Sequence, residues 1–139
     1  MIIETPVRKK KRTHDTNEAK LQMSCVEWLW NEYPETRGLY FCVNNENSRS
    51  KYESKTMQLI SGAQRKAMGV VAGVSDTICF IPSRGYHGLC IEFKISIGRQ
   101  SEAQKDWQQL VEEKGYKYVI IRSLDEFKKI IKWYLDEKK

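Results

Sequence analysis

The segment Gly-Leu-Cys-Ile-Glu-Phe-Lys-Ile-Ser at 88–96 constrains the fold more than any other part of the chain. Its apolar residues alternate with Glu92 and Lys94. Because successive side chains of a strand point to opposite faces, the acid and the amine share one face. Ionisable groups inside an apolar strand are costly to bury unless they are paired or bind a metal. The segment therefore predicts a strand that carries a functional pair.

This pair also has an ordinary explanation. The pattern Glu-x-Lys occurs six times in the chain, and an ion pair on a half-exposed strand contributes little to stability. Only the copy at Glu92 lies in an apolar strand. Upstream, Asp76 follows Gly73 at the start of the preceding strand-like run. Aspartate is also common in turns, so Asp76 could be only a turn residue. If the two runs form a hairpin, Asp76 approaches Glu92, and this combination favours a functional site.

Hydrophobic periodicity and turn signals predict an α/β fold with the order α-β-α-β-β-α-β-α. The expected helices span residues 15–33, 56–68, 101–114 and 124 to Tyr134 or beyond, and the expected strands span 39–43, 74–81, 88–96 and 116–122. Two sequences have the form of a capping box, Ser-Glu-Ala-Gln at 101–104 and Ser-Leu-Asp-Glu at 123–126. Gly115 lies where a glycine commonly follows a helix.

The chain of 139 residues is long enough for one compact α/β domain. We expect residues 15–139 to form it, after a basic and flexible arm at 1–14. The arm contains the run Arg-Lys-Lys-Lys-Arg at 8–12, which could contact phosphates or serve only as a solubilising tail. The net charge of +6 favours a polyanionic partner.

Several classes of protein are disfavoured by composition. No apolar run is long enough to span a bilayer, and no secretory signal begins the chain, so we expect a cytoplasmic protein without a membrane partner. The four cysteines lack the paired spacing of a zinc site, and we expect all of them to be reduced core residues. They are Cys25, Cys42, Cys79 and Cys90.

Three motifs occur in the order that is typical of one nuclease family. Gly-Val-Ser-Asp at 73–76, Ile-Glu-Phe-Lys at 91–94 and Ser-Glu-Ala-Gln at 101–104 together resemble the VRR-NUC branch of the PD-(D/E)XK nuclease superfamily. Asn17-Glu18 with Gln22, and residues 41–45, extend the resemblance, which covers about residues 18–122. Ser75 stands where the superfamily name suggests proline.

The resemblance implies a restriction-endonuclease-like core, with a central mixed sheet flanked by helices. It implies that Asp76, Glu92 and the carbonyl of Phe93 bind a metal and that Lys94 assists the nucleophilic water. Glu18 matches an acidic residue near the metal that can act through water, with Glu27 as a weaker competitor. Gln104 matches a glutamine beside the lysine. Helix capping could explain Glu18 or Gln104 equally well.

The activity implied by the resemblance is that of a Mg²⁺-dependent DNA endonuclease, in which Mn²⁺ can substitute. Two carboxylates suit Mg²⁺, a hard cation with oxygen ligands. Stand-alone members resemble homodimers that cut Holliday-junction-like or branched DNA. A non-catalytic nucleic-acid-binding module, or a nickase or exonuclease without junction preference, remains an alternative. Candidate DNA-binding residues in loops or beside the site are Arg49, Lys51, Lys55, Arg65, Lys66, Arg84 and Arg99.

Overall fold

A computed structural model describes residues 17–43 and 62–136. The predicted arm at 1–14 and three candidate DNA-binding residues, Arg49, Lys51 and Lys55, lie outside the described residues. A four-stranded sheet forms the centre, in the order β1 (Tyr40–Cys42), β2 (Thr77–Cys79), β3 (Leu89–Phe93) and β4 (Lys117–Ile121). β1, β2 and β3 pair antiparallel, while β3 and β4 pair parallel. The predicted mixed sheet and its hairpin are confirmed.

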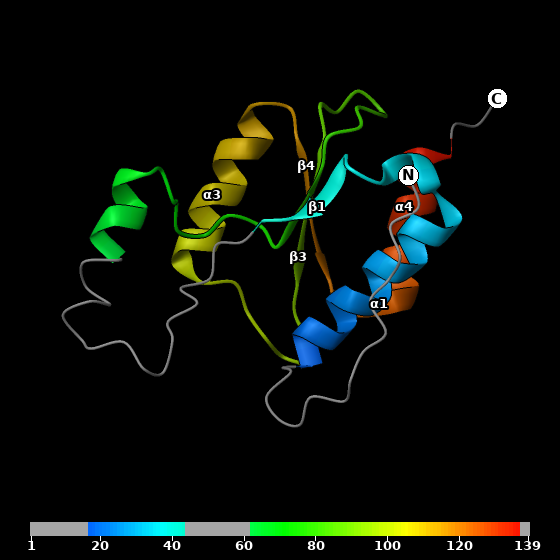
Figure 1. The fold of residues 1–139 in the computed structure, drawn as a ribbon, viewed down its shortest axis with the longest axis horizontal. Helices are drawn as coiled ribbons and strands as arrows, with labels where there is room; N and C mark the ends of the chain where they lie inside the picture. Colours follow the sequence, from blue (N-terminus) through cyan, green and yellow to red (C-terminus); the bar gives the residue numbers. More distant parts are fainter. Residues whose placement is uncertain (1–16, 44–61, 137–139) are drawn as a thin grey trace.

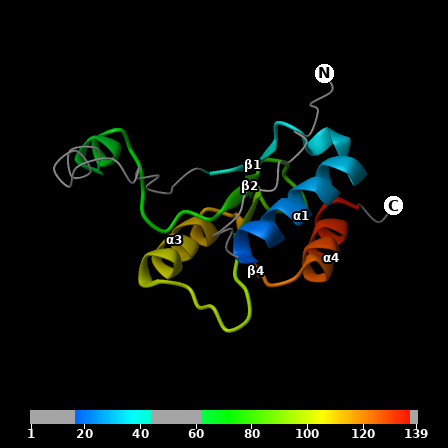
Figure 2. The same ribbon diagram turned by 60° about the horizontal axis from the view of Figure 1, so that its bottom comes forward.

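Helices cover both faces of this sheet. α1 (Asn17–Glu32) and α4 (Leu124–Leu135) lie on one side, and α3 (Glu102–Glu113) lies on the other (Figure 1). A short 3₁₀ helix, η1 (Pro34–Thr36), follows α1. Residues 62–67 are also helical and lie beyond α3, apart from the sheet (Figures 1 and 2). No helix in the described ranges is long and apolar enough to cross a bilayer.

The hydrophobic core lies between the sheet and the pair α1 and α4. Every second residue of β3, namely Leu89, Ile91 and Phe93, belongs to it. Phe127 of α4 packs edge-on against Tyr40, whose hydroxyl donates to the Thr77 side chain at 2.8 Å. Because residues alternate along β3, the side chains of Cys90 and Glu92 point to the opposite face, under α3. All five residues of β3 are buried, so this strand has no solvent-exposed face.

The observed strands are shorter than the predicted ones. β2 covers three residues where eight were expected, and β3 ends at Phe93 rather than at Ser96. Beyond Phe93, β2 does not pair with this segment, and the Lys94 amide donates to the Ile121 carbonyl at 3.0 Å. The apolar alternation in the sequence therefore continues beyond the end of the observed strand.

The cysteine prediction is wrong at one position. All four cysteines are free, as expected, and three are buried. Cys42 is exposed because β1 is the edge strand and α1 does not cover its last residue. The helix ends were predicted more accurately: Ser101 and Ser123 are the N-caps of α3 and α4, and Gly115, with a φ of 89°, follows α3.

Gly73 fixes the distance between the turn before β2 and the start of α3. Its φ is 87°, and a Cβ added there would lie 2.2 Å from the Ala103 carbonyl oxygen. Gly38 has nearly the same φ, 86°, but a Cβ there would meet nothing within 4 Å. A comparison of substitutions at Gly38 and Gly73 therefore distinguishes the cost of backbone strain from the cost of steric overlap.

We expect Gly38→Ala to lower the free energy of unfolding by about 1–2 kcal/mol, the cost of a left-handed backbone for a residue with a Cβ. Gly73→Ala should lower it by clearly more, because α3 must also move away from the turn. Urea unfolding of both variants measures this difference. Equal losses of unfolding free energy in the two variants would show that the close approach of Gly73 to α3 does not contribute to stability.

Candidate active site

Asp76 lies directly before β2 and is tied to both neighbouring strands through its backbone and side chain. The ladder pairs Thr77 with Ile91, so one further step sets Asp76 opposite Glu92. The Asp76 amide donates to Glu92 Oε2 at 3.2 Å, and Asp76 Oδ2 accepts from the Phe93 amide at 2.8 Å. The Val43 amide donates to the Asp76 carbonyl at 2.9 Å. The expected approach of the two acids therefore occurs.

Ser75 supports this arrangement from the preceding position. Its side chain is fully buried, and its hydroxyl donates to the Thr77 carbonyl at 2.9 Å. A buried hydroxyl of this kind fixes the backbone conformation by a local side-chain bond. The departure from proline at this position is thus compatible with an ordered entry into β2.

Glu92 and Lys94 are not an ion pair on an exposed sheet face. Their side chains are 3% and 13% exposed, and Lys94 Nζ lies 3.8 Å from Glu92 Oε1. Lys94 follows β3 on the same face as Glu92, as alternation predicts. The explanation by a solvated cross-strand pair is therefore wrong, because α3 covers this face of the sheet.

Gln104 belongs both to a helix cap and to the site. Its Oε1 accepts from the Ser101 amide at 2.9 Å, and its own amide donates to Ser101 Oγ at 3.2 Å, which completes a capping box. At the same time its Nε2 donates to Glu92 Oε1 at 2.8 Å. Gln104 therefore takes part in the capping box and also contacts Glu92, while its role in an active site stays a prediction. The cap uses the amide oxygen and leaves the nitrogen for Glu92.

The two carboxyl groups have raised pKa values. Burial is the largest cause for both. For Glu92, the charge of Asp76 raises the pKa further, while Lys94 lowers it. For Asp76, the Phe93 amide lowers the pKa and Glu18 raises it slightly. The two acids, one buried and one half-buried, therefore repel each other when both are ionised, and the single amine of Lys94 opposes this only in part.

The donor set fits a hard divalent cation. The pair offers carboxylate oxygens, and the Phe93 carbonyl points to the same edge of β3 as its amide, which faces Asp76. In the described residues, no three His, Cys, Asp or Glu side chains come close enough together to enclose an ion. Mg²⁺ commonly binds through one or two carboxylates and completes its shell with water and substrate phosphate, so two carboxylates suffice.

Glu18 lies at the start of α1, at the margin of the site. A Cβ added at Gly98 would be 3.6 Å from both Glu18 Oε1 and Lys94 Cβ, which places the three residues together. Glu18 reaches Asp76 only as a distant like charge. Glu27 is exposed further along α1. This placement brings Glu18 near Lys94 and Asp76, without a hydrogen bond from Glu18 to either acid within the described residues.

The candidate DNA-binding residues within the described ranges are not gathered in one place. Arg84 lies at the hairpin tip between β2 and β3, at the other end of these strands from Asp76. Its guanidinium donates to the carbonyls of Trp133 and Asp136, so it caps the end of α4. Arg99 is exposed in the loop between β3 and α3, and Arg65 and Lys66 lie on the outlying helix 62–67.

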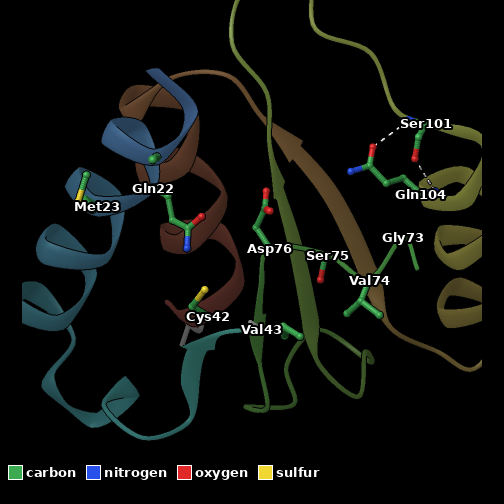
Figure 3. Close-up of a pocket in the computed structure, with 11 residues that line it drawn as sticks. Gln22, Met23, Cys42, Val43, Gly73, Val74, Ser75, Asp76, Ser101 and Gln104 are labelled. Carbon is green, nitrogen blue, oxygen red and sulfur yellow. Dashed lines mark hydrogen bonds between the residues drawn. The ribbon is translucent and has the colours of Figure 1, made fainter. Parts of the chain in front are cut away.

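Gln22 was not predicted as a site residue. It lies one turn after Glu18 on α1, and Figure 3 shows its amide pointing toward Asp76 across a cavity. Spacing could have indicated it, because residues four apart share a helix face. The signal is weak, since Leu21 and Cys25 of the core follow the same period.

The fold is an α/β domain with two acids and a lysine at the end of a central hairpin. The VRR-NUC domain model matches residues 14–125. The chain therefore belongs to the VRR-NUC family. A solved structure described as a VRR_NUC domain protein is similar in fold, with a TM-score of 0.70 and 23% identity over 89% of this chain and 92% of that one. A search of curated proteins gave no match.

The raised pKa values predict how stability depends on pH without a metal. An acid whose pKa is higher in the folded state holds its proton there more tightly, so stability falls as pH rises above its ordinary value, 4.5 for Glu92. Asp76→Asn should relieve this loss, since an amide can accept from Phe93 and donate to Glu92. In EDTA at pH 8 we expect its melting temperature to exceed that of the wild type by several degrees.

Below pH 4 this advantage should vanish, because both acids of the wild type are then protonated. Asp106→Asn, which changes an exposed carboxylate on α3, is the matched control and should show no such pH-dependent gain. A gain for Asp76→Asn that is equal at pH 4 and pH 8 would contradict the repulsion between Asp76 and Glu92.

Proposed function

We propose that this chain is a Mg²⁺-dependent nuclease that hydrolyses phosphodiester bonds in DNA, with Mn²⁺ as a substitute. The observation that carries the proposal is the pair of buried Glu92 and half-buried Asp76. The Asp76 amide donates to Glu92 Oε2 at 3.2 Å, and Lys94 Nζ lies 3.8 Å from Glu92 Oε1. Burial of two like charges beside one amine is unfavourable for the fold alone. A bound cation would remove the repulsion, and membership of a nuclease-type family supports this interpretation.

Each residue of the pair has a proposed role. Asp76, Glu92 and the Phe93 carbonyl would hold the ion, with Glu18 acting through water. Such an ion supplies stabilisation of phosphoryl charge and makes a nearby water more acidic. Lys94, as an ammonium donor, would orient the attacking water and offset the charge that develops on the phosphate.

Gln104 would act on Glu92 and not on the substrate. Its Nε2 donor holds Glu92 Oε1, and the capping box prevents the amide from turning over, because Oε1 is already bound by the Ser101 amide. Partners of metal-binding carboxylates orient them in this way. Gln104 is therefore a positioning residue in this proposal.

The DNA substrate and the homodimer are proposed from the charge of the chain and from the symmetry that paired cuts require. The net charge of +6 supports DNA as the partner, with Arg65, Lys66 and Arg99 as phosphate contacts. Arg84 is not included, because the end of α4 occupies its guanidinium. Symmetric cutting of branched or Holliday-junction-like DNA needs two sites related by a twofold axis, and a homodimer would provide them.

Glu92→Ala and Lys94→Ala should each abolish cleavage of labelled branched and linear DNA in Mg²⁺, and EDTA should abolish cleavage by the wild type. The control is the exposed Glu-x-Lys copy on α3 and its C-cap, altered as Glu112→Ala and Lys114→Ala. These two variants should cut as well as the wild type. Retained cleavage by both site variants would reject the site.

Wild-type protein that binds DNA in a salt-dependent way but forms no product in Mg²⁺ or Mn²⁺ would instead indicate a non-catalytic binding module. The position and number of cuts on each strand distinguish an endonuclease from a nickase or an exonuclease. The same gel therefore tests the proposed activity and its alternatives.

The role of Gln104 can be separated from its role in the helix cap. Gln104→Ala and Ser101→Ala should each destabilise the protein by about 1 kcal/mol, because each removes part of the capping box. Only Gln104→Ala removes the donor to Glu92, since Ser101→Ala keeps its backbone amide. We expect Gln104→Ala to lower Mg²⁺ affinity or activity by about 10–100-fold. Similar activity in the two variants would show that Gln104 acts on the helix alone.

A further inference from the structure

A cavity of about 420 Å³ opens beside Asp76. It is lined by α1, β1, the turn before β2 and the start of α3, and it is open to solvent (Figure 3). Gln22 projects into it from α1, and the sulfur of Cys42 points into it from β1 (Figure 3). Asp76 lies at its inner margin, so the cavity adjoins the proposed metal ligands.

The described part of this cavity's lining is almost uncharged. Asp76 is the one charged residue among the described residues that line it, and no lysine or arginine is among them. The remaining walls are apolar or neutral, from Val43, Val74, Ser101 and Gln104 among others. Phosphate groups are bound by cations and by backbone or side-chain donors in positive surroundings, and here a carboxylate is the nearest charge. The described walls of the cavity therefore suit a neutral ligand.

The polar groups of the cavity can recognise such a ligand. The Gln22 amide has no hydrogen-bond partner among the described residues, so both its donor and its acceptor are available. The Ser101 hydroxyl accepts from Gln104 and can still donate. A few polar groups in an otherwise apolar cavity are typical of a site for a small organic group.

We propose that this cavity binds the nucleoside next to the scissile phosphate, with its base unpaired. This inference rests on the proposed nuclease function, because a phosphate held at Asp76 and Glu92 brings its neighbouring nucleoside to the mouth of the cavity. A base that is paired and stacked in a duplex cannot enter a space lined by α1, β1, the turn before β2 and the start of α3. A nucleoside that has left the stack can enter, and unstacking costs least where the base is already unpaired. The site therefore selects DNA with an unpaired nucleotide beside the cut.

Cys42 provides a direct probe of occupancy. Because Cys25, Cys79 and Cys90 are buried, a small maleimide should modify Cys42 first, and a Cys42→Ser protein identifies that product by mass. The alkylation rate is measured in EDTA, with bound DNA that carries either a normal nucleotide or an abasic analogue beside the cut phosphate. We expect the intact DNA to protect Cys42 and the abasic DNA to protect it much less. Equal protection at equal saturation would contradict the proposal.

Cleavage kinetics give an independent test. The cut phosphate is mapped with wild-type protein, and the substrate is then remade with an abasic analogue on either side in turn. Removal of the base on one side should lower kcat/KM about tenfold, as expected for the loss of a few contacts to one base. Cys42→Trp, which fills the cavity, should cause a similar loss on intact DNA and little further loss on abasic DNA.

Leu39→Trp is the matched control, because Leu39 is exposed beside the same strand but does not line the cavity. It should cut both substrates at wild-type rates. If the losses from Cys42→Trp and from base removal multiply, the two act independently and the cavity does not bind the base. If the wild-type protein cuts intact and abasic DNA at the same rate, the cavity proposal alone is contradicted. If the wild-type protein cuts no DNA, the proposed function is contradicted.

Discussion

The hydrogen bond between the Asp76 amide and Glu92 is the interaction on which the rest of the site depends. It forms because β2 and β3 pair in a register that brings position 76 opposite position 92. A slip of one residue would turn Glu92 into the hydrophobic core and move Ile91 to the opposite face, under α3. The core side of the sheet fixes this register, since Leu89, Ile91 and Phe93 all pack there. Hydrophobic burial on one face thus determines the positions of charged groups on the other.

The second constraint is the start of α3. Gly73 allows the turn before β2 to touch the helix backbone, and the capping box at Ser101 and Gln104 fixes where the helix begins. The same glutamine then bonds to Glu92. A helix end that is fixed by a local capping motif is unusually precise, because two reciprocal hydrogen bonds define its first turn. The site uses this precision to orient one carboxylate.

Much of this arrangement could be predicted from sequence because it follows from periodicity. Alternation placed Glu92 and Lys94 on one face, and the hairpin pattern brought Asp76 near them. Alternation could not show whether that face was exposed or lay under α3, because this depends on packing between elements distant in sequence. For the same reason Arg84 looked like a loop cation, while its guanidinium in fact caps α4. Contacts within an element and across the hairpin were predictable, and contacts between elements distant in sequence were not.

The two acids are held by the sheet, whereas the adjoining cavity is lined partly by surrounding elements. This difference matters for how the site could acquire selectivity for its substrate. The carboxylates are held by ladder hydrogen bonds and by burial on both faces of β3, so substitutions near them affect the fold as well as the chemistry. Gln22 reaches the adjoining cavity from α1 and, within the described ranges, makes no hydrogen bond to Asp76 or Glu92. Cys42 lies at an exposed strand edge. Changes at these two positions can therefore alter what the cavity accepts without moving the groups proposed to hold the metal.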